Sequence, residues 1–194
     1  AGVVGQSAAR LAMAMGAEVT LLNRSSGRLR RFVAHGYPGS LRTNLATATS
    51  ITEAITTADA VIGGVYVGGA RATHVISREM LSLMSDGAVI VDVSIDQGGC
   101  FETSHATTYE DPVYEVDGVI HYCVANMPGA VPQTATLALT NETLQYVRVI
   151  AEMGVEAACA ADPVLARGLN AYHGKITNEA VANAVGLEFA PLGG

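Results

Sequence analysis

The sequence predicts an α/β fold with a doubly wound parallel sheet, followed by a helical segment that belongs to a second domain. Three observations support this prediction. A glycine-rich turn opens the chain and enters a helix, apolar runs then alternate with helical stretches, and the last third is mostly helical in pattern. Alternating strands and helices are typical of a parallel sheet covered by helices on both faces.

Composition and charge limit the possible partners. The 194 residues are 49% hydrophobic and only 15% charged, which favours a large packed core. The formal net charge of −7 leaves no basic stripe along which a nucleic-acid duplex could bind. No apolar run reaches the roughly 18 residues of a membrane span. We therefore expect a soluble protein whose partner is a small molecule, with neither nucleic acid nor membrane.

Cysteine and histidine usage argues against disulfides and metals. Cys100, Cys123 and Cys159 are an odd number at wide spacing, without a CxxC motif. The five histidines also lack the spacing of metal ligands. We expect no metal site and a reducing, cytoplasmic location.

The elements of the first 132 residues follow from local patterns. The stretch Ser50-Ile51-Thr52-Glu53 has the form of a capping box, and an irregular segment is expected between residues 93 and 119. Helices are expected at 7–15, 28–33, 50–58 and 77–84, and strands at 18–22, 60–62, 88–93 and 119–124.

The pattern changes after Pro132. Helices are expected over 134–153, from Asp162-Pro163 onward, and over 177–185. About sixty helical residues are few for an independent core. We predict a dinucleotide-binding domain over residues 1–132, lacking its first strand, and a segment over 133–194 that returns to a substrate domain.

The opening turn matches the back half of a dinucleotide-binding fingerprint. Gly2-x-x-Gly5 precedes a helix whose free N–H groups and dipole favour phosphate. Gly2 would allow close approach to a pyrophosphate, and Gly5 would allow close helix–strand packing. A glycine-rich turn without a ligand is the alternative, so this motif needs support from its surroundings.

The strand ending at Asn23 lies where the fingerprint expects a ribose-binding side chain, 18 residues after Gly5. An acidic residue is usual there, because it hydrogen-bonds the ribose 2′-hydroxyl and repels a 2′-phosphate; an amide can still hydrogen-bond a hydroxyl. The amide leaves NADP open as an alternative to NAD, and Arg24 and Arg28 are near enough to bind a phosphate. A solvated helix start is the competing interpretation of the two arginines.

Two later loops should lie at the carboxyl edge of the sheet, where such sheets bind ligands. Asp96 follows the clearest strand, and could relay protons beside a nicotinamide ring if it is partly desolvated. Capping of the loop is its alternative role.

Asp92, inside the apolar run, is expected to make structural hydrogen bonds. Asn126 lies in the second loop and could contact the carboxamide, although a plain interdomain turn is also possible.

Three strings together closely resemble the bacterial alanine dehydrogenase family over nearly the whole chain. They are 95–99 (Ile-Asp-Gln-Gly-Gly), 124–132 (Val-Ala-Asn-Met-Pro-Gly-Ala-Val-Pro) and 139–141 (Leu-Thr-Asn). The NAD-binding component of a nicotinamide nucleotide transhydrogenase looks less similar, because that family lacks the Asp-Gln-Gly-Gly string.

The resemblance implies reversible NAD-dependent oxidative deamination of L-alanine to pyruvate and ammonia, by a homo-oligomer, in this family a hexamer. Asp96 matches the catalytic aspartate, and His105 stands where some relatives have arginine. The cofactor-binding positions implied are Gly2, Val3, Val4, Gly5, Asn23, Arg28, Val65, Ile95, Asp96, Val124, Asn126 and Met127. A transhydrogenase component and a non-catalytic dinucleotide-binding module are the alternative functions.

Overall fold

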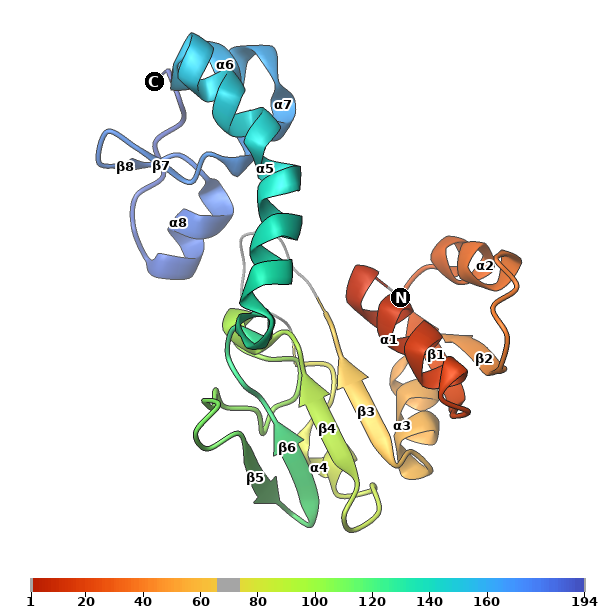
Figure 1. The fold of residues 1–194 in the computed structure, drawn as a ribbon. Helices are drawn as coiled ribbons and strands as arrows, with labels where there is room; N and C mark the ends of the chain where they lie inside the picture. The colour runs from red at the N-terminus through yellow and green to blue at the C-terminus, as the bar shows by residue number, and fades with distance from the viewer. Residues whose placement is uncertain (1, 66–73, 194) are drawn as a thin grey trace. The chain divides into compact units, whose positions relative to one another are not determined.

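The computed structural model describes residues 2–65 and 74–193, which form two compact units (Figure 1). The first unit comprises the described residues up to 125, and the second comprises residues 126–193. The predicted α/β class is confirmed: helices and strands alternate through the first unit. The assignment of residues 133–194 to a substrate domain stays a prediction.

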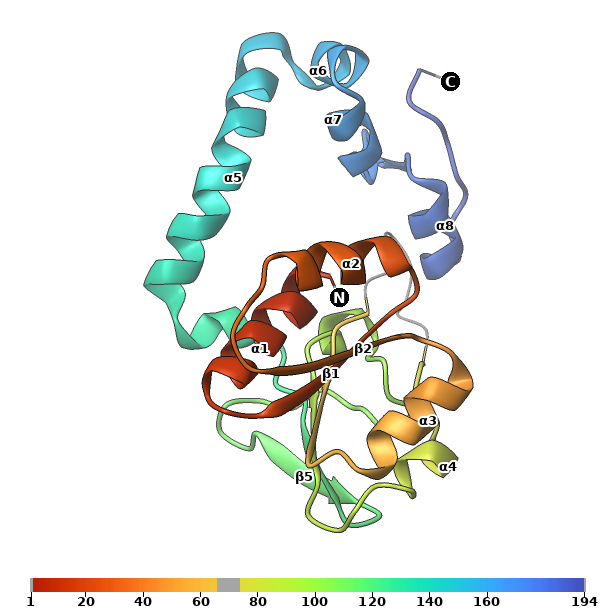
Figure 2. The ribbon, with the colours of Figure 1, turned by 90° about the vertical axis from the view of Figure 1, so that its right-hand side faces the viewer.

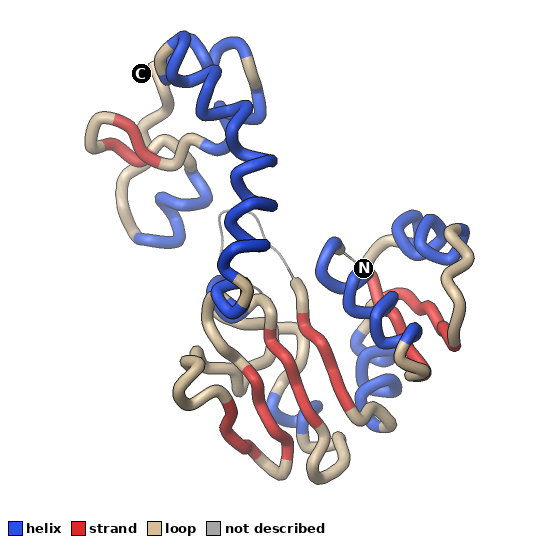
Figure 3. The backbone as a smooth tube through the Cα atoms, viewed as in Figure 1, coloured by secondary structure: helices blue, strands red, loops and turns tan. Residues whose placement is uncertain are grey.

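The first unit contains two groups of strands (Figures 1 and 3). One is a parallel pair, and the other is a four-stranded sheet of order β3-β4-β6-β5 in which only β5 is antiparallel. Within the described residues, β1 pairs only with β2, and β3 pairs only with β4. The elements in chain order are α1 (Val3–Ala14), β1 (Glu18–Asn23), α2 (Ser26–Ala34), β2 (Ser40–Leu45), α3 (Ala48–Thr56), β3 (Ala60–Gly63), α4 (Arg78–Leu81), β4 (Val89–Asp92), η1 (Ile95–Gln97), β5 (Val113–Val116) and β6 (Val119–Tyr122).

Two strands were missed by the sequence patterns for a physical reason. β2 has one half-buried residue among five exposed ones, and β5 alternates between exposed and half-buried positions. Neither strand needs the apolar run that marks a strand buried on both faces. β5 therefore occupies part of the segment expected to be irregular.

Two apolar clusters hold the first unit together, one for each group of strands. Helices α1 and α2 lie beside β1 (Figure 2), and their side chains pack with Leu21. Around β4, α3 and α4 contribute Ile51, Ile55 and Leu81 to a cluster with Ile90. Burying such side chains contributes about 1.5–3 kcal/mol each. These clusters fix the helices that surround the strand ends.

Gly63 is the tightest point of the second cluster. A Cβ atom at this position would overlap Cys100 Sγ and lie 2.5 Å from Phe101 Cε2, both of them buried side chains. The close approach of β3 to this segment therefore requires glycine.

The predicted capping box was placed three residues too late. α3 begins after Thr47, whose Oγ1 accepts a hydrogen bond from Ser50 N at 3.2 Å, while Thr47 N donates to Ser50 Oγ at 3.0 Å. Ser50 is thus the third helical residue rather than the cap. A serine hydroxyl can act either at the N-cap or at the third helical position of a capping box. The prediction from the Ser-x-x-Glu spacing therefore put the start of the helix at the wrong residue.

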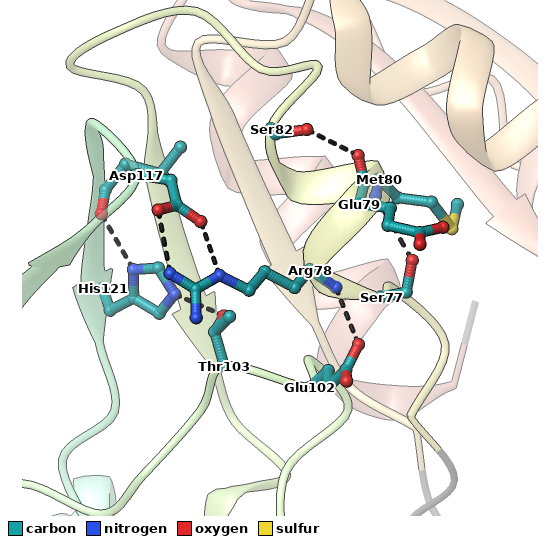
Figure 4. Close-up of polar contacts among 10 residues, drawn as sticks. Ser77, Arg78, Glu79, Met80, Ser82, Glu102, Thr103, Asp117 and His121 are labelled. Atoms are coloured by element: carbon teal, nitrogen blue, oxygen red, sulfur yellow. Dashed lines mark hydrogen bonds and ion pairs between the residues drawn. The ribbon is translucent and has the colours of Figure 1, made fainter.

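The short helix α4 is fixed to the β5–β6 hairpin by Arg78 (Figure 4). Its guanidinium donates two hydrogen bonds to the Asp117 carboxylate, at 2.8 and 3.0 Å, and its backbone N donates to Glu102 Oε2 at 2.8 Å. The bond with Arg78 lowers the pKa of Asp117, which sits in the hairpin turn with φ of 51°. This contact is exposed, so we attribute to it the orientation of the turn rather than much stability.

His121 on β6 is fully buried and bonded through both ring nitrogens. Nδ1 donates to the carbonyl of Val119 at 2.9 Å, which leaves Nε2 to accept from the Thr103 hydroxyl at 2.7 Å (Figure 4). This pairing fits the neutral ring. Burial lowers the pKa of His121 below its ordinary value.

We predict that His121 makes the protein less stable as the pH falls below about 6.5. Its unfolded-state pKa is the higher one, so the unfolded chain binds the proton first, and the loss continues until the pH passes the lowered folded-state pKa. Thermal unfolding midpoints between about pH 7.5 and about pH 5 would measure this, with His121→Gln as the comparison. An identical slope in that variant would contradict the assignment.

The second unit consists mainly of helices. The predicted helices near 134–153 and 177–185 are present, and the helix after Asp162 begins with that residue as its N-cap. A short helix at 155–161 and a small hairpin were not predicted. The elements are η2 (Met127–Ala130), α5 (Pro132–Met153), α6 (Val155–Ala161), α7 (Pro163–Gly168), β7 (Ala171–Tyr172), β8 (Lys175–Ile176) and α8 (Glu179–Val185).

The helix α5 has no buried residue along its length. Leu137 and Leu139 expose 58% and 64% of their surface. Among the described residues, no helix combines the length and apolar character that crossing a membrane requires.

Candidate functional site

Three neighbouring parallel strands bring their carboxyl ends to one edge of the sheet. Gly63 at the end of β3 pairs with Asp92 at the end of β4, and Val91 of β4 pairs with Tyr122 of β6. The segments that follow contain Val65, the η1 turn and Val124. The predicted carboxyl-edge loops of β4 and β6 therefore leave the sheet from adjacent strands.

The segments after β3 and β4 are joined directly. Ser94 Oγ donates a hydrogen bond to the carbonyl of Val65 at 2.7 Å, and Val93 N donates to the carbonyl of Gly63 at 2.9 Å. Ser94 is buried, so these bonds are shielded from water. They hold Val65 beside the η1 turn.

Asp92, at the end of β4, accepts several hydrogen bonds from the loop that follows this strand. Its fully buried carboxylate accepts hydrogen bonds from Ser94 N at 3.0 Å, Cys100 N at 2.8 Å, Phe101 N at 3.4 Å and the Ser104 hydroxyl at 2.7 Å. A carboxylate is suited to gathering several backbone donors. The predicted structural role of Asp92 is confirmed.

Cys100 beside Asp92 is not an available nucleophile. Burial, followed by the Asp92 charge and the hydrogen bond to it, raises the pKa of the thiol to about 12. The reactive thiolate is therefore scarce at neutral pH. No group of three or more histidine, cysteine or acidic side chains within residues 2–65 and 74–193 could hold a metal ion.

The η1 turn presents Asp96 to solvent on a well-defined backbone. Gly98 N donates to the carbonyl of Ile95 at 2.9 Å, and Gly98 closes the turn with φ of 98°. Asp96 is exposed in the described chain, while the neighbouring Ile95 is buried. The partial desolvation of Asp96 beside a bound nicotinamide ring stays a prediction.

Gln97 was missed by the sequence analysis as a site residue. Its Oε1 atom is buried and has no hydrogen-bond partner in the described part of the chain. Leaving such an acceptor unpaired costs free energy, so it points to a donor supplied from elsewhere. The string Asp-Gln-Gly-Gly indicated this loop as a candidate site. The burial of the Gln97 side-chain oxygen, however, could not be predicted from the sequence.

The start of α1 lies close to two of these loops. A Cβ on Gly64 would be 3.3 Å from Val4 Cγ1, and a Cβ on Gly2 would be 3.9 Å from a guanidinium nitrogen of Arg28. Val3 is 86% exposed. The glycine turn is thus flanked by the end of β3 on one side and the start of α2 on the other.

Gly5 does not have the packing role expected of it within the described chain. A Cβ at this position would be 4.0 Å from Leu21 Cδ1, which is ordinary van der Waals contact. The contact with β1 therefore tolerates alanine, and any need for glycine at position 5 comes from another neighbour.

Asn23 ends β1 and shapes the turn into α2. Its side-chain Nδ2 donates to the carbonyl of Ser25 at 2.9 Å, with Ser25 Oγ at 3.5 Å. The amide is half-buried, while Arg24 and Arg28 are exposed. This places Asn23 at the carboxyl end of its strand, as predicted.

The last predicted positions follow β6. Val124 is fully buried, and Ala125 N donates to the carbonyl of Thr107 at 3.1 Å. Asn126 and Met127 belong to the second unit. Asn126 has φ of 53°, an uncommon conformation for a residue other than glycine that is often found at functional sites.

Comparisons with known proteins give one consistent result. A family model described as alanine dehydrogenase/PNT, C-terminal domain, matches residues 1–179. The alanine dehydrogenase of Halomonas elongata is 53% identical over 188 residues, covering 97% of this chain and 50% of that protein. That of Bacillus subtilis is 44% identical over 191 residues, covering 98% and 50%.

Solved structures agree in fold. An L-alanine dehydrogenase superposes with a TM-score of 0.79 at 42% identity, covering 95% of this chain and 51% of that one. A transhydrogenase from Sinorhizobium meliloti reaches 0.70 at 24% identity, which shows likeness of fold alone. The chain spans about half the length of the curated relatives it matches.

Proposed function

The chain belongs to the alanine dehydrogenase/PNT C-terminal domain family, and from this membership we propose that its parent protein is an NAD-dependent alanine dehydrogenase. The proposed reaction converts L-alanine, NAD⁺ and water into pyruvate, ammonium, NADH and a proton, and it is reversible. The presentation of Asp96 on the η1 turn, at an edge shared by three parallel strands, is the structural observation that carries the proposal.

The residues around this edge fit a dinucleotide. In this proposal the glycine turn of Gly2 to Gly5 would give a pyrophosphate close backbone approach and helix N–H groups, and Asn23 at the end of β1 would contact a ribose. The unpaired Gln97 oxygen indicates that the η1 turn lacks a donor that a bound group could supply. Val65, Ile95 and Val124, with Asn126 and Met127, stay predictions for the nicotinamide and adenine contacts.

Asp96 is proposed as the group that moves protons. NAD, when bound, supplies the hydride acceptor for the substrate α-carbon. An exposed carboxylate on a fixed turn can take a proton from the substrate amino group or from water and return it in the reverse reaction. Ser94, through its bond to Val65, keeps the turn in place.

The sheet supports the proposed domain organisation. β1 and β3 each have one edge without a partner in the described chain, and α1 packs against both strands. We propose that one strand of the parent protein pairs between them, so that both apolar clusters join a single sheet. The exposed apolar residues of α5 agree with coverage by the substrate domain or by another subunit of a homo-oligomer, proposed here as a hexamer.

A cytoplasmic location is proposed from the cysteines. All three are buried and free of disulfides, as expected in a reducing compartment.

Full-length parent protein should form NADH when supplied with NAD and L-alanine, and little without the amino acid. The measurement is NADH absorbance over time, with D-alanine as a matched control. Protein that binds NAD but forms no NADH with L-alanine would contradict the proposal. Hydride exchange between two nicotinamide nucleotides in the same preparation would favour the transhydrogenase alternative instead.

A further inference from the structure

We propose that the parent protein accepts NADP as well as NAD, because the end of the site that would receive the adenosine ribose has no carboxylate and has two uncommitted arginines. This rests on the proposed dinucleotide site. The ligand class is a nicotinamide dinucleotide whose adenosine carries a 2′-phosphate.

Asn23 is the residue that would meet the ribose hydroxyls. It ends β1, 18 residues after Gly5, where an acidic side chain ordinarily selects NAD by repelling a 2′-phosphate. An amide carries no charge and so does not repel the phosphate. Its Nδ2 is held by the carbonyl of Ser25, so the side chain is fixed in the turn.

The sequence around Asn23 offers no acidic residue to replace the missing carboxylate. The sequence has no aspartate or glutamate from residue 19 to residue 52. Glu18, the nearest in sequence, begins β1, about 16 Å from Asn23 at the rise of an extended strand. It lies 3.7 Å from Arg42, which further offsets its charge.

The same interval is rich in arginine, on a chain whose net charge is −7. Three of the arginines are already bonded: Arg42 pairs with Glu18, Arg30 donates to Ser26 Oγ at 3.1 Å, and Arg31 donates to the carbonyl of Gly27 at 3.4 Å. Arg24 and Arg28 have no hydrogen bond or ion pair within residues 2–65 and 74–193. They are therefore available to a ligand.

Arg28 connects the two parts of the site. Its guanidinium lies 3.9 Å from the place of a Cβ on Gly2, so it reaches from α2 to the opening of the glycine turn. A planar guanidinium binds phosphate through two parallel hydrogen bonds. Arg24, directly after Asn23, would contribute the second positive charge.

The test compares both cofactors in the full-length protein. NADH and NADPH affinities are read from nucleotide fluorescence, and kcat/KM with L-alanine is read for NAD and NADP. We expect NADPH to bind within about tenfold of NADH, since a charge-assisted contact offsets the larger ligand. Asn23→Asp should weaken NADPH binding at least about tenfold and change NADH binding less than about threefold.

Two further variants separate charge from loss of the turn contact. Asn23→Ala removes the amide without adding a charge, so it should weaken NADH and NADPH binding by similar factors and leave their ratio close to that of the unmodified protein. Arg28→Gln should weaken NADPH selectively, while the matched change Arg30→Gln should not, because Arg30 is already bonded to Ser26.

The outcomes distinguish this inference from the proposed function. NADPH binding more than about 100-fold weaker than NADH binding, and unchanged by Asn23→Asp, would overturn the inference while alanine-dependent NAD reduction survived. Tight NADPH binding without turnover of L-alanine would overturn the proposed reaction alone. Failure to bind either nucleotide would overturn both.

Discussion

Replacing Asp96 with Asn in the full-length protein is expected to lower kcat for L-alanine oxidation by roughly 100-fold to 10,000-fold, the usual contribution of a positioned acid or base. The substitution keeps the size of the side chain and removes its ability to take up a proton. Because Asp96 is exposed on a turn fixed by backbone bonds, the fold should be unaffected. Steady-state kinetics in both reaction directions would measure the effect.

Cofactor binding separates a chemical role of Asp96 from a binding role. NADH affinity, measured by fluorescence, should change less than about threefold, since a carboxamide fills the same space. Asp111→Asn is a matched control, because Asp111 is also an exposed loop aspartate of the first unit. Full activity in Asp96→Asn would remove the carboxylate from the mechanism, and a parallel loss in Asp111→Asn would indicate a general charge effect.

Replacing Asp92 with Ala is expected to give the largest loss of stability, at least about 3 kcal/mol. The change leaves the buried backbone donors of Ser94 and Cys100, and the half-buried hydroxyl of Ser104, without their shared acceptor. For a domain of this size, that corresponds to a fall of roughly 6–12 °C in the thermal midpoint. Thermal unfolding of the full-length protein, followed by circular dichroism, would measure it.

Ser104→Ala is the graded control for this prediction. It removes one donor at 2.7 Å and leaves Asp92 its backbone partners, so the expected loss is about 1 kcal/mol. If Asp92→Ala does not accumulate as folded protein, Asp92→Asn keeps one acceptor oxygen and should fall between the two. Unfolding of Asp92→Ala within about 1 kcal/mol of the unmodified protein would show that water replaces the lost acceptor.

The parallel strands β3, β4 and β6 could be predicted from the sequence because their pattern is local. β3, β4 and β6 are short runs rich in β-branched and apolar residues between turn residues, and such runs are typical of strands in a parallel sheet. β2 and β5 could not be recognised, because polar or charged side chains interrupt the apolar run in both strands. The start of α3 was misplaced because Thr47 and Ser50 offer equivalent hydroxyl groups.

The candidate site was predictable to the same extent. Strand ends and the glycine turn placed Asn23, Asp96 and Val124 at the carboxyl ends of their strands, because that follows from the topology. The exposure of Asp96, the unpaired oxygen of Gln97 and the available space beside Gly5 depend on contacts between distant segments. Such contacts cannot be predicted from a local sequence pattern.

The packing at Gly63 also restricts the order in which substitutions at this position and at its neighbours can be accepted. Any side chain at position 63 collides with Cys100 and Phe101, so a larger residue can arise only after one of those neighbours has become smaller. The shrinking substitution costs stability by opening a cavity, and the growing one can then restore it. A substitution at position 63 therefore depends on an earlier substitution at position 100 or 101. We expect the sequence of this part of β3 to change slowly for that reason.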